Sequence, residues 1–112
     1  VGVDSSKFRT DIINEKMFMQ KVDLDISEGA DIVIVKPALP NLDLILRTKQ
    51  RHPTIPIAAY QVSGEYVMIR SPAEKGLLNE EALLMETLNS IKRAGADMIL
   101  TYHALQAAEL LK

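Results

Sequence analysis

Four consecutive β-branched residues, Ile32–Val35, run directly into Lys36 and Pro37. An uninterrupted apolar run of this kind is typical of a strand that is buried on both faces. The residue before a proline favours an extended conformation, so Lys36 should continue the strand. The pattern therefore predicts a buried strand over residues 32–36 that presents one amine at its C-terminal end.

The chain repeats this arrangement of a turn followed by a strand. The sequence Gly-Ala-Asp at 29–31 precedes the first apolar run, and the same three residues return at 95–97, before the apolar residues 98–102. A glycine that ends a helix, followed by a short turn and an apolar run, is typical of helix-to-strand connections. A third apolar run lies between the two copies. We therefore expect three strands, at 32–36, 55–60 and 98–102.

Apolar residues at helical spacing surround the expected strands. They predict amphipathic helices near residues 14–28, 40–52, 79–93 and 104–112. A short helix or turn is expected around 64–69, with Pro72 breaking it. The predicted order of elements is α-β-α-β-α-β-α.

Strands that alternate with helices predict an α/β fold with a parallel sheet and right-handed crossovers. The 112 residues, of which 47% are hydrophobic, correspond in size to one small domain. Three strands alone would expose an apolar face and two unpaired edges. We therefore expect residues 1–112 to be a single segment of a larger barrel, or to have their edges covered by another chain.

The charge and composition of the chain argue against several classes of function. The net charge of -2, without a dense run of Lys or Arg, is not that of a protein that binds nucleic acid or a membrane surface. No apolar run approaches the roughly 18 residues that span a bilayer. The absence of cysteine excludes disulfides and thiolate metal sites within the segment. A small soluble partner is favoured, and no metal site is expected.

Lys36 has two interpretations. A lysine at the end of a buried strand is costly to desolvate unless it is paired or its pKa falls, and a neutral lysine amine forms Schiff bases with ketones. The other interpretation is that the side chain simply ends the strand and reaches into solvent.

The repeat places Lys36 and Tyr102 at equivalent positions. Each lies five residues after the aspartate of its Gly-Ala-Asp copy, on strands separated by one intervening strand. In a (β/α)8 barrel, alternate strands supply the side chains of one interior layer. Ser63 follows the middle strand and should lie at the same rim. An amine and two hydroxyls at one rim suit a small keto acid.

Three further polar residues are not expected to take part in the chemistry of the site. His52 should face solvent in a turn, and His103 should point away from Tyr102 because successive side chains alternate. Glu65 is interpreted as structural.

Three motifs, at 29–37, 59–66 and 90–102, closely resemble the C-terminal third of porphobilinogen synthase, also called δ-aminolevulinate dehydratase. The resemblance extends from about Asp4 to Leu111. It implies that the chain is the C-terminal three βα units of a (β/α)8 TIM barrel.

The resemblance also implies an activity and a set of site residues. The family is a lyase that condenses two molecules of 5-aminolevulinate into porphobilinogen in tetrapyrrole (haem) biosynthesis. Lys36 matches the lysine that forms a Schiff base with the first substrate, and Ser63 and Tyr102 match the residues that hold its carboxylate. Phe8-Arg9 stands where members of the family usually carry a Tyr-Gln pair that helps to close over the second substrate's carboxylate, and Arg9 is the expected bidentate contact to that carboxylate. The second Schiff-base lysine belongs to an earlier strand, so the isolated chain should be inactive.

Cofactors and partners follow from the same resemblance. No cofactor is expected within this segment, whereas full-length members of the family use zinc or magnesium. Lys21 stands where magnesium-stimulated members carry a glutamate, which argues against that site here. The expected partner chains are further copies, octameric in the family, or a complementary fragment, in the cytoplasm or a plastid. The alternative is a degenerate, non-catalytic homologue that acts in binding or assembly.

Overall fold

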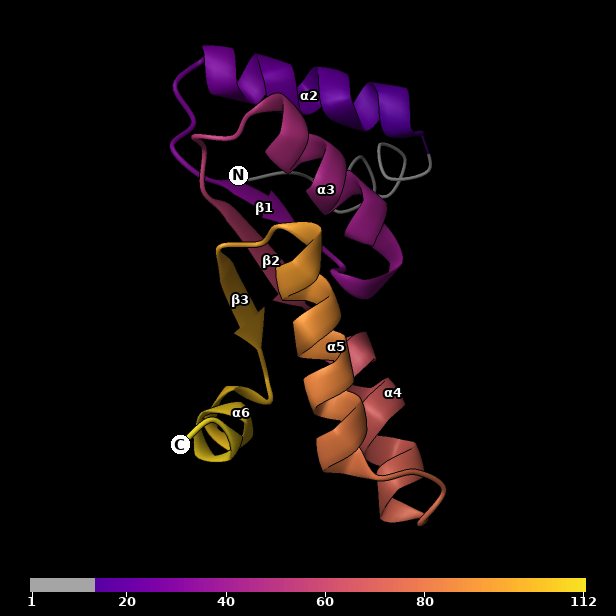
Figure 1. The fold of residues 1–112 in the computed structure, drawn as a ribbon. Helices are drawn as coiled ribbons and strands as arrows, with labels where there is room; N and C mark the ends of the chain where they lie inside the picture. The colour runs from indigo at the N-terminus through magenta and orange to yellow at the C-terminus, as the bar shows by residue number, and fades with distance from the viewer. Residues whose placement is uncertain (1–13) are drawn as a thin grey trace.

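The computed structural model describes residues 14–112 as a three-stranded parallel sheet with helices packed against one of its faces (Figure 1). The elements, in chain order, are α2 (Glu15–Ser27), β1 (Val33–Val35), the 3-10 turn η1 (Leu39–Asn41), α3 (Leu42–Arg51), β2 (Ile57–Gln61), α4 (Ser63–Glu74), α5 (Glu80–Ala94), β3 (Met98–Thr101) and α6 (Ala104–Leu110).

The sheet has the order β1-β2-β3, with both pairs parallel. Val35 pairs with Ala59, and Ala59 in turn pairs with Ile99. This register confirms the three predicted strands and their order. It also fixes which side chains share a face, because successive residues of a strand point to opposite sides.

One face of the sheet carries the core of the protein. Val35, Ile57 and Ala59 are fully buried on this face. They pack against Phe18 of α2, against residues of α3 and α5, and against further apolar side chains of the same cluster. Burial of these apolar side chains stabilises the packing of the helices on the sheet.

The opposite face of the sheet is open. Ile34 is 37% exposed, Leu100 is 49% exposed and Tyr102 is 59% exposed. The prediction that the strand at 32–36 is buried on both faces is therefore wrong for the described residues. The strand has the composition of a doubly buried strand, but the helices of residues 14–112 cover only every second side chain.

Helix α4 also differs from its prediction. It is a regular helix of 12 residues, and Pro72 lies inside it near its C-terminal end. Proline removes only its own backbone donor and disturbs the preceding turn, so a helix that is about to end tolerates it. The short helix or turn predicted around 64–69 is thus the centre of a longer element.

The second Gly-Ala-Asp copy forms a corner between β2, β3 and α3. The carboxylate of Asp97 accepts a hydrogen bond from the backbone N–H of Ile57 at 2.9 Å and from Lys49 Nζ at 2.9 Å. Gly95 has φ +124°, and a Cβ atom there would lie 3.0 Å from Lys49 Cβ. Glycine is required at 95 both for its backbone conformation and for this close approach.

The Asp97 corner makes stability depend on pH. The hydrogen bond from Lys49, followed by that from Ile57, lowers the pKa of the Asp97 carboxyl below its ordinary value of 3.8. The contribution is therefore present above pH 3.8 and is lost as the pH falls through the lower, folded-state pKa. We expect Asp97→Asn to flatten the acid limb of a urea-midpoint profile measured below pH 4. Lys49→Met should flatten it less, and an unchanged acid limb in Asp97→Asn would contradict the assignment.

The open face should drive self-association of the 112-residue chain, because exposed apolar sheet faces and unpaired strands recruit other chains. Sedimentation velocity should detect oligomers or aggregates, and Leu100→Gln should weaken the association. Leu77→Gln is the matched control, since Leu77 is exposed but lies away from the sheet, between α4 and α5. A monodisperse wild-type monomer would be incompatible with this expectation.

Candidate functional site

Lys36 and Tyr102 directly follow β1 and β3. They continue the alternation of Ile34 and Leu100, the exposed side chains of the open face. The C-terminal ends of parallel strands meet at one edge of a sheet. The structure therefore brings the predicted lysine and tyrosine to the same edge of the same face.

Ser63 lies at this edge as well. It is the first residue of α4, which begins two positions after the end of β2. The three predicted residues thus follow three neighbouring strands. Arg9 lies outside the described residues.

Tyr60 is a further hydroxyl of the site that the sequence reasoning did not single out. Its hydroxyl donates a hydrogen bond to the Tyr102 hydroxyl at 3.4 Å. The two rings, with Leu100 and Thr101, line an open hollow of about 350 Å³. The hydrogen bond to Tyr102 raises the pKa of Tyr60, and the charge of Tyr102 and burial act in the same direction. Tyr60 therefore remains a protonated donor at neutral pH. The alternation along β2 was the signal that could have identified it.

Glu65 is buried beside the same edge and joins two of the segments that form it. Its carboxylate accepts hydrogen bonds from the backbone N–H groups of Ala38, Leu39 and Val62 at 2.9, 3.0 and 3.1 Å. Ala38 and Leu39 follow Lys36 in the chain, and Val62 immediately precedes Ser63. The prediction that Glu65 is structural did not include this connection between the two segments.

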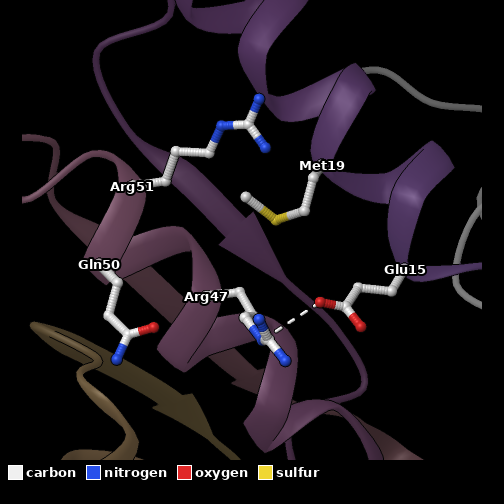
Figure 2. Close-up of a pocket in the computed structure, with 5 residues that line it drawn as sticks. All are labelled: Glu15, Met19, Arg47, Gln50 and Arg51. Carbon is white, nitrogen blue, oxygen red and sulfur yellow. Dashed lines mark ion pairs between the residues drawn. The ribbon is translucent and has the colours of Figure 1, made fainter.

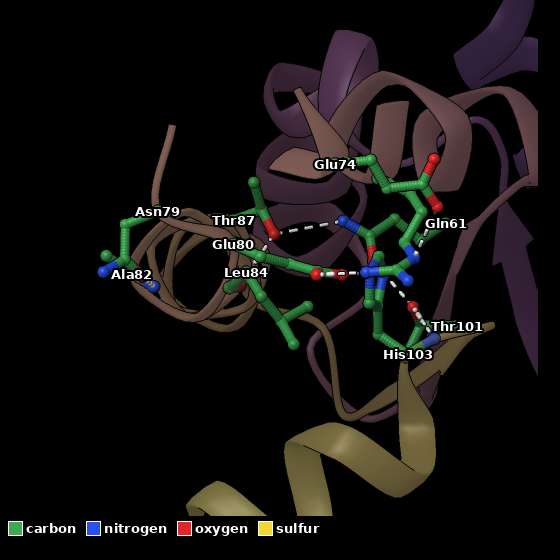
Figure 3. A network of polar contacts seen from close by, with 10 residues as sticks. Gln61, Glu74, Asn79, Glu80, Ala82, Leu84, Thr87, Thr101 and His103 are labelled. Atoms are coloured by element: carbon green, nitrogen blue, oxygen red, sulfur yellow. Dashed lines mark hydrogen bonds and ion pairs between the residues drawn. The ribbon is translucent and has the colours of Figure 1, made fainter. Parts of the chain in front are cut away.

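A buried polar network supports the end of β3 (Figure 3). Gln61 donates from Nε2 to Thr87 Oγ1 at 3.1 Å and accepts from Thr101 Oγ1 at 2.7 Å. Thr101 Oγ1 accepts in turn from the backbone N–H of His103 at 3.1 Å. The chain on either side of Tyr102 is therefore tied to β2 and α5.

The His103 ring is buried on the helical side, as its predicted direction away from Tyr102 requires. It is 2% exposed, with Nε2 3.4 Å from a carboxylate oxygen of Glu80 and its ring centroid 4.5 Å from that of Tyr66. Tyr66 also lies beside Tyr102, with ring centroids 5.8 Å apart. The prediction for His52 is wrong, because its Nε2 pairs with Asp23 at 2.7 Å and only 21% of its side chain is exposed.

A second hollow, of about 290 Å³, lies between α2 and α3 (Figure 2). It contains two arginines, but Arg47 pairs with Glu15 at 3.2 Å and Arg51 pairs with Asp23 at 2.5 Å. Both guanidinium groups therefore already have carboxylate partners. This hollow therefore offers no unpaired arginine to an anionic ligand.

Residues 14–112 contain no group of three or more His, Cys, Asp or Glu side chains that could hold a metal ion. Lys21, the residue that argues against a magnesium site in the sequence, pairs with Asp25 at 3.7 Å. Within the same residues, no helix has the length and apolar character needed to cross a membrane.

Comparison with known proteins gives consistent matches along the chain. A family model described as "Delta-aminolevulinic acid dehydratase" matches residues 2–110. Proteins of that name from Synechococcus elongatus and Archaeoglobus fulgidus are each 50% identical to this chain, over 96% and 97% of it and 33% of their own length. The chain therefore spans about a third of the length of these curated relatives.

The fold of this chain is also similar to that of a solved structure. It is delta-aminolevulinic acid dehydratase (porphobilinogen synthase) from Toxoplasma gondii in complex with the reaction product porphobilinogen. The TM-score is 0.89 at 40% sequence identity, over 98% of this chain and 31% of that one. That agreement supports the parallel sheet as part of a (β/α)8 barrel.

The buried amide of Gln61 should make Thr87 important for stability. Thr87→Val would leave Gln61 Nε2 without its acceptor, and we expect the free energy of unfolding to fall by about 1–3 kcal/mol. Thr48→Val is the control, because the buried hydroxyl of Thr48 donates to the Leu44 carbonyl within its own helix. Urea denaturation of both variants checks this, and equal losses would contradict the role given to Gln61.

Proposed function

The chain belongs to the delta-aminolevulinic acid dehydratase family, and on this premise we propose that it carries the first-substrate half-site of a porphobilinogen synthase. Lys36 is the proposed Schiff-base lysine for 5-aminolevulinate. The observation that carries the proposal is the position of Lys36, at the end of β1 and on the open face that also bears the Tyr60 and Tyr102 hydroxyls.

Lys36 supplies the covalent step. The nitrogen of its neutral amine forms a bond to the ketone carbon, and the carbonyl oxygen leaves as water with the two amine protons. The resulting imine, once protonated, withdraws electrons from the neighbouring carbon. This step requires neither an oxidant nor a reductant.

Ser63 and Tyr102 hold the substrate carboxylate at the other end of the keto acid. Hydroxyl donors orient an anion through hydrogen bonds. Tyr60 adds support, because its proton is donated to the Tyr102 oxygen and leaves the Tyr102 proton available for the ligand. Arg9 is the proposed contact for the second substrate.

Turnover requires protein beyond this segment. The second Schiff-base lysine and any catalytic metal site belong to parts of the family's barrel that lie outside this chain. We infer that the missing parts are supplied by the rest of a longer protein, by a complementary fragment or by further copies in a homo-oligomer. The compartment is proposed to be the cytoplasm, or the plastid in a plastid-bearing organism.

A role in binding or assembly without turnover is the second candidate. The exposed apolar side chains of the sheet favour it, because such a face suits a protein partner. The two functions differ in whether Lys36 reacts with substrate.

Borohydride trapping tests the proposed function. Incubation with 5-aminolevulinate and borohydride should leave a reduced adduct on Lys36, while turnover by the 112-residue chain should be undetectable. Lys36→Met should abolish the adduct. Lys92→Met, at an exposed lysine at the end of α5, should leave it intact. Peptide mass spectrometry locates the adduct, and labelling of Lys49 or Lys92 in place of Lys36 would disprove the site.

The carboxylate contacts are measured in the same assay. Ser63→Ala and Tyr102→Phe should each weaken substrate binding by about 1–3 kcal/mol, as expected for one hydrogen bond to a charged group. They should leave the adduct on Lys36 at saturating substrate. An unchanged substrate dependence in both variants would remove these two residues from the site.

A further inference from the structure

Glu65 makes an unusual set of contacts for a buried carboxylate. The residue is 5% exposed, and the two carboxylate oxygens accept three hydrogen bonds from the backbone. Two donors, Ala38 and Leu39, come from the connection after β1. The third, Val62, lies at the start of α4, so a single side chain joins segments that are more than 20 residues apart in the sequence.

The connection after β1 is held from the side of β2 as well. The Ala38 N–H also donates to the Tyr60 carbonyl at 3.0 Å, and Ala38 is completely buried. Within the connection, the Asn41 amide donates to the Pro37 carbonyl at 2.7 Å. The backbone that follows Lys36 therefore has little freedom to move relative to β2.

A glutamate is well suited to this position. A carboxylate offers only acceptors, and all three partners are donors. Glutamine would turn an N–H₂ group toward at least one N–H group. Aspartate would keep the charge but shorten the side chain by one methylene, so that it could not reach both segments equally.

We propose that Glu65 is a positioning residue that fixes the separation between the Lys36 amine and the Ser63 hydroxyl. The carboxylate holds the residues after Lys36 against the turn that begins with Ser63. A ligand bound covalently to the amine must also reach the hydroxyl with its carboxylate. The fixed separation therefore selects one spacing between the ketone and the carboxylate of the ligand. The proposal rests on the proposed function and makes Glu65 the determinant of selectivity for a γ-keto acid.

The chain length of the keto acid supplies a readout that a purely structural role would not change. Levulinate has the same spacing between ketone and carboxylate as 5-aminolevulinate, and 5-oxohexanoate is one methylene longer. In the wild-type protein, borohydride trapping on Lys36 should favour levulinate. In Glu65→Gln this preference should fall about tenfold or more, because small displacements of reacting groups cost up to about 10²-fold in rate.

Hydrogen exchange tests the anchoring without depending on the Schiff base. The amides of Leu39 and Val62 should be protected in the wild type and should exchange about tenfold faster or more in Glu65→Gln, as expected when a hydrogen bond to a charged acceptor is lost. The Ala38 amide should change less, because it also donates to the Tyr60 carbonyl. Glu86→Gln is the matched control, because it removes the same charge from an exposed position on α5. It should change neither the exchange nor the trapping preference. The variants are made in the protein at its natural full length.

The outcomes separate the two proposals. If the wild type forms no Lys36 adduct with either keto acid, the proposed function fails, and the exchange of the Leu39 and Val62 amides alone decides whether Glu65 anchors the connection. Unchanged exchange in Glu65→Gln overturns the anchoring, and faster exchange with an unchanged trapping preference overturns the positioning role. If Glu65→Gln does not fold, Glu65→Asp replaces it, with an intermediate loss of preference expected.

Discussion

The alternation of side chains across the three-stranded sheet is the constraint on which the rest of the structure depends. Val35, Ala59 and Ile99 share one face through the observed register, and their neighbours in each strand share the other. A slip of one residue in any strand would exchange the two faces of that strand. The core and the candidate site therefore rely on the same register, one on each side of the sheet.

The sequence was sufficient to predict the strands, their parallel order and the common edge of Lys36, Ser63 and Tyr102. The reason is physical, because the repeated Gly-Ala-Asp turn fixes where two strands begin, and the period of two fixes where their side chains point. The same reasoning failed for the open face. A run such as Ile32–Val35 has the composition of a strand covered on both faces, and composition cannot say whether the second cover belongs to the same chain.

Glu65, Tyr60 and the network around Gln61 were beyond sequence reasoning for a different reason. Each acts through a partner 26 to 42 residues away, and no periodicity links such positions. Glu65 also sits in the first turn of α4, where an acidic residue is common for helix stability alone. Its connection to the residues after Lys36 is visible only in three dimensions.

The open face has a consequence for how selection acts on this chain. On the helical side, the effect of a substitution at Ile57 or Ala59 on stability depends on contacts with residues of this same segment. On the open side, the effect of a substitution at Ile34 or Leu100 depends on the residues that cover these side chains in the assembled protein. A mutational scan of the isolated segment would therefore rank polar substitutions there as harmless or beneficial, and the ranking would reverse in the complete assembly. Tolerance to mutation is, for half of this sheet, a property of the neighbouring protein.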